Sequence, residues 1–452
     1  MSGAEEEPIT ISSQESVEVK EPEDPQKDKN TSVTAEERLG ELKGDAIGDT
    51  LFSERFVLRT LIHLSKLDKS LQEDEAFESD LCVLWDMTLV TDVSKVLLEH
   101  SVLEVFSGLI QQSDDKRLIE ILVGIIGNMC NYGGARDHIR KNKAIMDPIL
   151  NLISCTDALT LIQLMRLFHT VFALETVENS RVWFDMFEDL QPWTEQFAYI
   201  LSNSCNETLL KGCLEALNSI TFKHSELKNG DDDFPTFPLS VSLVKGVLDS
   251  FKSLMDTEKP ETTFDDSDDE EDGKNDTIAQ TKANQEISTI FVNLHVIFSQ
   301  ENEAVDVYEP VMNDLLDAIS SILSPLCEPY CLLPLTNYET CCFENLNDLF
   351  DALSDPFHEK CFVQFVKIWE LFVNDAENKE NDEFEEPNED CSEVIECLLQ
   401  VIGRLAAAGQ GDHLVSALKS IQKNTVKKLQ THLEDNVEAI AAIKSALLVL
   451  KK

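Results

Sequence analysis

The chain has 452 residues, 42% of them hydrophobic, and carries 37 Lys and Arg against 85 Asp and Glu. That length and apolar content are sufficient for a large buried core. The formal charge of −48 predicts no binding to nucleic acid and favours a basic protein partner. The longest uncharged stretch, 121–135, has 15 residues, fewer than the roughly 18 of a membrane span, so we expect no membrane partner.

The acidic residues concentrate in three segments that we expect to be disordered. Residues 1–30 contain nine acidic and three basic residues, residues 256–276 contain eleven and two, and residues 375–390 contain nine and one. Such segments cannot bury enough apolar surface to offset the entropy of ordering them. We therefore predict a disordered acidic tail at 1–42 and disordered acidic loops at 256–283 and 375–390.

The N-terminal residues carry acids where a secretory signal would carry positive charge and then an apolar run. The twelve cysteines show no spacing typical of a small disulfide-bonded domain. Both observations predict reduced thiols in the nucleus or the cytoplasm.

The predicted folded part begins near residue 43, and strand signals are nearly absent along it. A first amphipathic helix is expected from Ser53 to Leu67. The most apolar helix is expected over 118–129, where hydrophobic residues occupy nearly every face, with Asp114 as its cap and Gly133 and Gly134 ending it. A helix that is buried on every side needs neighbours on both flanks, as in the interior of a stacked helical array.

A repeat of 42 residues links segments 85–87, 127–129 and 164–172, and each of the first two is followed by a turn, a short polar helix and another apolar helix. A period of 40 to 47 residues with two or three helices is typical of armadillo and HEAT arrays. Looser copies occur at 214–220, 290–294, 343–349 and 402–407. We therefore predict an all-α, armadillo- or HEAT-like helical solenoid, with repeats over 43–255 and 284–374 and C-terminal helices over 391–452.

Asn128 is the candidate for partner binding, because a side-chain amide offers a donor and an acceptor to the backbone of an extended peptide. The alternative is that Asn128 and Asn131 satisfy carbonyls at the end of their helix. The corresponding positions in neighbouring repeats are Asp86, Thr170 and Asn218. These four residues form the predicted groove. Gly124, four residues before Asn128, departs from the Trp of nuclear-import receptors.

Other candidate sites are weaker. The spacing of Cys327, Cys331, Cys341, Cys342, His358 and Cys361 lacks the paired hooks of a zinc ribbon, and buried cysteines are the alternative, so we predict no metal. Ser267, followed by three acids, is a hypothetical site for an acid-directed kinase. No phosphate loop or hydrolase motif is present, so we predict no enzyme and no cofactor.

Segments 44–48, 84–87 and 124–130 together resemble the serum amyloid A-like (SAAL) family. The resemblance covers residues 44–153. It implies an armadillo-type fold, a nuclear location and a role in promoting cell proliferation, and it carries no catalytic residues over to this chain. The first functional hypothesis is therefore a scaffold that binds an extended segment of a protein partner. The alternative is an acidic chaperone for basic proteins such as histones, acting through the acidic segments.

Overall fold

The computed structural model describes residues 45–67, 70–71, 74–188, 192–231, 233–257, 270–379, 389–409 and 411–451, and at 257, 270–283, 378–379 and 389–390 it describes the backbone only. The predicted tail at 1–42 and Ser267 lie outside these ranges. Contacts divide the chain after Ser53 into two units. The described part of the first is a tight loop, in which Ala46 and Ser53 form an isolated bridge and the amide of Ile47 donates to Phe52 O at 2.9 Å.

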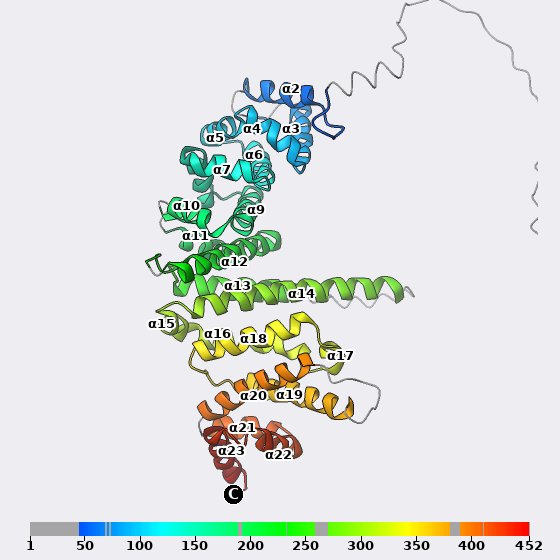
Figure 1. The fold of residues 1–452 in the computed structure, drawn as a ribbon, viewed down its shortest axis with the longest axis vertical. Helices are drawn as coiled ribbons and strands as arrows, with labels where there is room; N and C mark the ends of the chain where they lie inside the picture. The colour runs from blue at the N-terminus through cyan, green and yellow to red at the C-terminus, as the bar shows by residue number, and fades with distance from the viewer. Residues whose placement is uncertain are drawn as a thin grey trace, which may run out of the picture. The chain divides into compact units, whose positions relative to one another are not determined.

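The second unit confirms the predicted all-α class, since its described residues form helices and no strand. The first two helices are α2 (Glu54–Leu64) and α3 (Glu75–Met87). Three repeats follow, each with two shorter helices and a longer third helix (Figure 1). Their bounds are α4 (Thr91–Glu99), α5 (Val102–Gln112) and α6 (Lys116–Met129); α7 (Gly133–Lys141), α8 (Lys143–Leu150, extended by the 3-10 turn η1, Asn151–Ser154) and α9 (Ala158–Leu174); α10 (Val177–Glu188), α11 (Trp193–Asn203) and α12 (Glu207–Gly230).

The remaining helices continue the array with less regular units. They are α13 (Val241–Thr257), α14 (Glu270–Ser299), α15 (Ala304–Tyr308, followed by the turn η2, Glu309–Val311), α16 (Met312–Leu326), α17 (Pro329–Leu332), α18 (Asn337–Ala352), α19 (Glu359–Lys379), α20 (Glu389–Ala408), α21 (Asp412–Ser420), α22 (Lys423–His432) and α23 (Val437–Leu450). Of the two predicted acidic loops, 258–269 and 380–388 lie outside the described residues. The backbone of 270–283 is helical.

Two rows of stacked helices build the second unit. In the first row each helix packs against the next in the order α3, α6, α9, α12, α14, α18, α20 and α23; we call this the third-helix row. The other row runs α5, α8, η1, α11, α13, α16, α19 and α21. Stacking each helix between two neighbours of its own row buries apolar surface that no single repeat could bury alone.

Helix α6 is the interior helix that its composition predicts, since eleven of its fourteen residues are buried. Two details of the prediction are wrong. Its cap is Asp115, whose carboxylate accepts from the amides of Arg117 and Leu118 at 3.0 and 3.2 Å, and not Asp114. Gly133 begins α7 and does not end α6, because Cys130, in a right-handed conformation, already closes the last turn.

Candidate functional site

Asn128 lies in the last turn of α6 and is 5% exposed. Its Nδ2 donates to the backbone oxygen of Trp85 at 3.0 Å and to the hydroxyl of Thr88 at 3.1 Å, and its Oδ1 accepts from Arg166. An amide nitrogen has two N–H donors, and both are used inside the protein. Asn128 therefore holds the end of α3 and the middle of α9 to α6. Its role as a ligand for a partner stays a prediction.

Gly124 is explained by the indole of Trp85. A Cβ built on Gly124 would lie 2.2 Å from the Trp85 ring, a separation that no side chain tolerates. The half-buried indole of Trp85 reaches from α3 to cover α6 one turn before Asn128. Aromatic surface is therefore present beside Gly124, and the preceding helix of the third-helix row supplies it.

The other three predicted residues have different surroundings. Asp86 is exposed. Thr170 is half-buried, and its hydroxyl donates to the backbone oxygen of Arg166, one turn earlier, at 2.9 Å. Asn218 is half-buried, and its Oδ1 has no hydrogen-bond partner within the described ranges. In that part of the chain no hydrogen bond joins these three side chains to Asn128. Of the four predicted groove residues, Asn128 is the one whose side chain bonds to helices of neighbouring repeats.

Arg166 is the residue that the sequence reasoning missed. It is the only Lys, Arg, Asp or Glu in the 17 residues of α9, and that isolation was the available signal. Burial lowers the pKa of its guanidinium. Among the described residues, no carboxylate lies within ion-pairing distance of it. Other arginines do reach a carboxylate: Arg59 with Asp80, Arg117 with Glu78, Arg136 with Glu175, Arg140 with Asp137, Arg181 with Asp231 and Arg404 with Asp355.

Arg166 lines a pocket of 340 Å³ on the third-helix row. Lys211 on α12 lies 3.1 Å from a carboxylate oxygen of Glu286 and 4.0 Å from one of Glu215, so its charge is already paired. A guanidinium has five N–H donors, and Arg166 uses one of them on Asn128. The lining residues are Ile162, Arg166, Glu207, Thr208, Lys211, Gly212, Glu215, Leu254 and Ile287.

Polar contacts join successive helices of the third-helix row beyond α9. His169 Nδ1 lies 2.8 Å from the hydroxyl of Ser219 on α12. Further along, the Asn345 amide on α18 donates to Asn293 on α14 at 2.9 Å, and Arg404 on α20 donates to the backbone oxygen of Asn347 on α18 at 3.0 Å. Each joint uses a different pair of residues.

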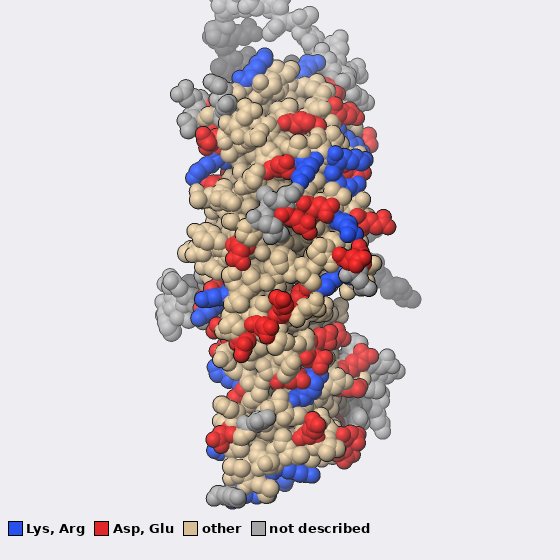
Figure 2. Space-filling view, turned by 90° about the vertical axis from the view of Figure 1, so that its left-hand side faces the viewer, with Lys and Arg blue, Asp and Glu red and all other residues tan. Residues whose placement is uncertain are grey.

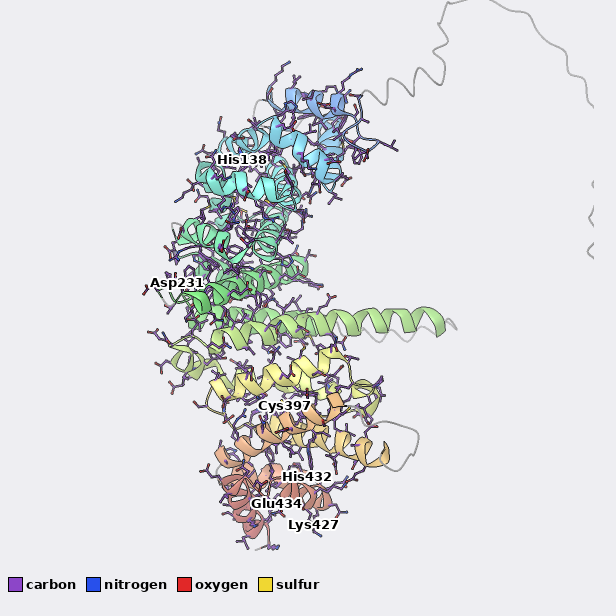
Figure 3. All side chains as sticks on the ribbon, viewed as in Figure 1. His138, Asp231, Cys397, Lys427, His432 and Glu434 are labelled. Carbon is purple, nitrogen blue, oxygen red and sulfur yellow. The ribbon has the colours of Figure 1, made fainter. Side chains whose placement is uncertain are left out.

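A second pocket on the same row, of 510 Å³, lies between α18 and α20 and is acidic. Cys397, labelled in Figure 3, lines it, and burial together with nearby carboxylates raises the pKa of its thiol to about 11. None of the four carboxylates in its lining forms an ion pair with any described residue. Those carboxylates belong to Glu344, Asp348, Glu393 and Glu396.

The cysteines considered for a metal site are dispersed in the structure. Cys331 and Cys341 are exposed, whereas Cys342 and Cys361 are buried. His358 Nδ1 lies 3.3 Å from the sulfur of Cys361. Throughout the described ranges, no three His, Cys, Asp or Glu side chains come together as a metal would need.

The face drawn in Figure 2 carries acidic and basic side chains interspersed among large uncharged areas. No field of a single sign covers it, so this face by itself gives little preference for a highly charged partner. Within the described part of the chain, no single helix is long and apolar enough to cross a bilayer. Helices α6 and α7 pass that test only as a pair, with a bend of 113° between them.

Comparison with known proteins gives a partial match. No family model matches the chain. The protein saal1 of zebrafish is 30% identical over 214 residues, which cover 45% of each chain, and that of Xenopus tropicalis is 31% identical over 205 residues, which cover 43% of this chain and 44% of that protein. The matched region thus spans a little under half of these relatives, and the similarity agrees with the resemblance read from residues 44–153.

Solved structures are more distant. The crystal structure of SYS-1 aligns with 87% of this chain and 62% of its own at a TM-score of 0.43 and 12% identity. A designed armadillo repeat protein aligns with 65% of this chain and 98% of its own at a TM-score of 0.39 and 12% identity. At these TM-scores the alignments carry no argument, and the helical-repeat fold is read from the packing of the helices themselves.

Proposed function

We propose that this chain is a non-enzymatic scaffold that binds an extended segment of a protein partner along the third-helix row. The observation that carries the proposal is Arg166, an exposed cation with unused N–H donors and no described carboxylate within ion-pairing distance, in a pocket formed by α9, α12, α13 and α14. The surrounding protein lowers the pKa of the guanidinium, and a carboxylate or a backbone carbonyl of a bound segment would stabilise its charged form.

The experiment compares the intact protein with Arg166→Gln. The substitution removes the charge, and because the glutamine side chain is shorter it also removes the bond to Asn128, so the unfolding of each variant is measured beside its binding. Partners found by proximity labelling in cells would be purified and their affinities measured. A hydrogen bond to a charged group contributes about 1.5–3 kcal/mol, so we expect affinity to fall by at least about 10-fold.

The matched control is Arg59→Gln, which removes an exposed arginine of α2 that lies 3.5 Å from Asp80. It should leave affinity unchanged. A photo-crosslinking residue at Thr208, in the lining of the pocket, should label the partner, whereas one at exposed Glu104 on α5 should not. Unchanged affinity in Arg166→Gln together with crosslinking from Glu104 would refute this placement of the surface.

We also propose, from the family resemblance, that the protein acts in the nucleus and promotes cell proliferation. Fractionation of cells that express the tagged full chain tests the location. Depletion followed by rescue with Arg166→Gln tests whether proliferation depends on the same surface. Normal proliferation after depletion would remove this part of the proposal.

The acidic pocket between α18 and α20 favours a second candidate, a chaperone for basic proteins such as histones. Four unpaired carboxylates around a pocket of 510 Å³ would attract lysine and arginine side chains. Replacing Glu344, Asp348, Glu393 and Glu396 by their amides should then remove a steeply salt-dependent interaction with histones. Deleting 258–269 tests the contribution of the acidic segment separately. Binding that survives both changes would exclude the acidic pocket and the 258–269 segment as the histone-binding sites, and no histone binding by the unmodified protein would exclude the chaperone.

A further inference from the structure

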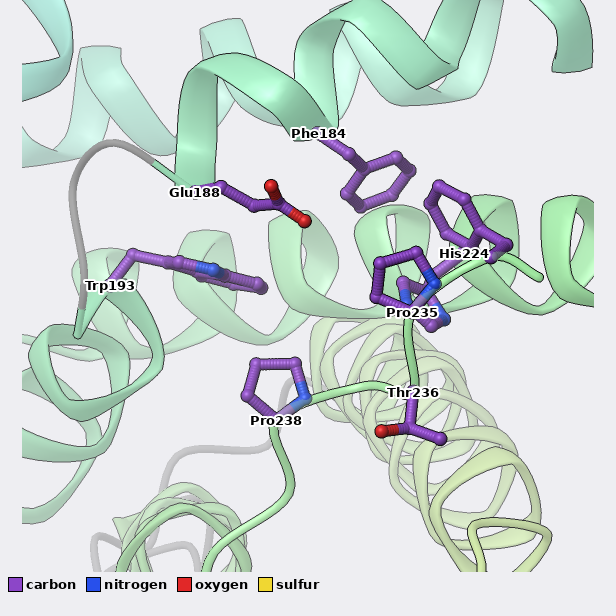
Figure 4. Close-up of a pocket in the computed structure, with 8 residues that line it drawn as sticks. Phe184, Glu188, Trp193, His224, Pro235, Thr236 and Pro238 are labelled. Atoms are coloured by element: carbon purple, nitrogen blue, oxygen red, sulfur yellow. The ribbon is translucent and has the colours of Figure 1, made fainter.

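A separate pocket lies at the other end of α12, beside the segment that links α12 to α13. Its volume is 310 Å³, near the lower end of the range for ligand sites. Figure 4 shows the Trp193 indole on one side of the opening, Phe184 and the Glu188 carboxylate on a second side, and two prolines on the others. The full lining is Phe184, Glu188, Trp193, His224, Phe234, Pro235, Thr236 and Pro238.

The aromatic walls are held in place by their neighbours. The Trp193 ring lies edge-on to Phe187 at 5.2 Å and to Phe237 at 5.7 Å between centroids. Phe184 lies edge-on to Phe234 at 5.8 Å. Buried rings fixed in this way lose little entropy when a ligand contacts them, so the pocket is preformed.

The charge at this pocket is a single carboxylate. Glu188 is exposed and pairs with no cation of the described chain. The nearby cations are engaged elsewhere: Arg181 lies 2.7 Å from a carboxylate oxygen of Asp231, and Lys228 lies 2.6 Å from one of Glu301. Burial, and then Lys228, lowers the pKa of His224 to about 4, so His224 is neutral near pH 7. The pocket therefore combines aromatic and proline surface with one uncompensated negative charge.

We propose that this pocket binds a methylated ammonium group. A cation within about 6 Å of a Trp or Phe face is attracted by the ring quadrupole, and the attraction grows as the cation loses water. Methyl groups replace N–H donors that would otherwise need hydrogen bonds, and they supply apolar surface for Pro235 and Pro238. The carboxylate of Glu188 would neutralise the charge at the rim.

The proposal is independent of the proposed function. Helix α12 rises about 1.5 Å per residue, so His224 lies roughly 20 Å along the axis from Lys211 in the Arg166 pocket. Asp231, labelled in Figure 3, directly follows α12 and marks the end of that helix nearest the pocket lined by Trp193 and Glu188. Loss of binding at one pocket therefore leaves the other testable.

The test is a titration of the full-length protein with choline, followed by the NMR signal of the Trp193 indole N–H, which Trp193→Phe assigns. The neutral isostere 3,3-dimethyl-1-butanol has the same shape without the charge. We expect choline to shift the signal saturably and the isostere to bind about 5- to 30-fold more weakly, the range of a cation–π contact. Equal binding of the two, or no shift with choline, would overturn the proposal.

Two variants locate the charge. Glu188→Gln removes the rim carboxylate and should weaken choline binding, yet leave it tighter than binding of the isostere, because the aromatic rings still attract the cation. Glu178→Gln removes an exposed acid of the same helix, about ten residues away, and should bind choline as the unmodified protein does. An equal loss in both variants would mean that only the general acidity of the chain attracts choline, and would count against the pocket.

A second titration separates the two sources of such a group. A twelve-residue peptide with one central trimethyl-lysine is compared with the same peptide carrying unmodified lysine. Tighter binding of the trimethylated peptide than of choline would assign the pocket to a modified protein partner. Tighter binding of choline would assign it to a small molecule. If the unmodified peptide bound as tightly as the trimethylated one, the preference for methyl groups would be wrong.

Discussion

Replacing Asn128 by Ala should destabilise the repeats around α6. The change removes two hydrogen bonds donated to Trp85 and Thr88 and one accepted from Arg166, at a site that is 5% exposed. With about 1 kcal/mol for each bond, and more where a buried group is left unsatisfied, we expect the free energy of unfolding to fall by about 2–4 kcal/mol.

The assay is chemical denaturation combined with amide hydrogen exchange, because a repeat array can open locally. Exchange should accelerate in α3, α6 and α9 and stay unchanged beyond α18. The control is Asn131→Ala, three residues later and exposed, which should change stability by less than about 0.5 kcal/mol. If Asn128→Ala were as stable as Asn131→Ala and yet lost a binding partner, the hydrogen bonds of Asn128 would be dispensable for stability. The predicted role of Asn128 in the groove would then be supported.

Three further outcomes are expected. Gly124→Ala should lower the free energy of unfolding by about 1–3 kcal/mol, because the added methyl meets the ring of Trp85. Gly127→Ala should raise it by about 0.5–1 kcal/mol, since the nearest neighbour of its Cβ would lie at 3.7 Å. Denaturation midpoints measure both changes, and a shift of the two midpoints in the same direction would contradict this prediction. Burial lowers the pKa of His295 to about 3, so the unfolded chain binds a proton first as pH falls. The histidine therefore contributes stability above pH 6.5 that is lost as pH falls toward 3, about 2 kcal/mol by pH 5, and His295→Phe should flatten that part of the stability curve; a parallel curve would refute it. Burial raises the pKa of the Cys130 thiol to about 12, so iodoacetamide at pH 8 should leave it unmodified until denaturant is added, a result read by mass spectrometry. Rapid native modification of Cys130 would show that α6 opens. The exposed cysteines that should react first are Cys205, Cys331 and Cys341.

The helices were predictable where periodicity was strong. Segment 118–129 is apolar on nearly every side. A helix of that kind is stable only when other helices cover it on both flanks, so α6 and its repeat could be predicted from the sequence. The ends of helices depended on weaker signals. Gly133 and Gly134 favour a left-handed stop, yet the chain turns before them and uses both glycines to begin α7.

The candidate site was less predictable, because its chemistry depends on contacts between repeats. The sequence shows that Asn128 ends a helix, but the partners of its amide are on α3 and α9, about 40 residues away on either side. The role of Arg166 could not be predicted, because a single arginine in an apolar helix can be structural or functional until its neighbours are known. That no described carboxylate reaches ion-pairing distance of Arg166 depends on how the helices pack, and it cannot be predicted from one segment.

The joints between helices of the third-helix row differ from one another: an amide with an arginine, an imidazole with a hydroxyl, and two amides. In an array of identical repeats, any helix could dock on a wrong neighbour and leave one repeat out, a known route to misfolding in repeat proteins. Here a helix that skipped its neighbour would leave the buried amide of Asn128 without its partners, at a cost of about 1–3 kcal/mol. These differing polar contacts therefore specify the order in which the repeats stack.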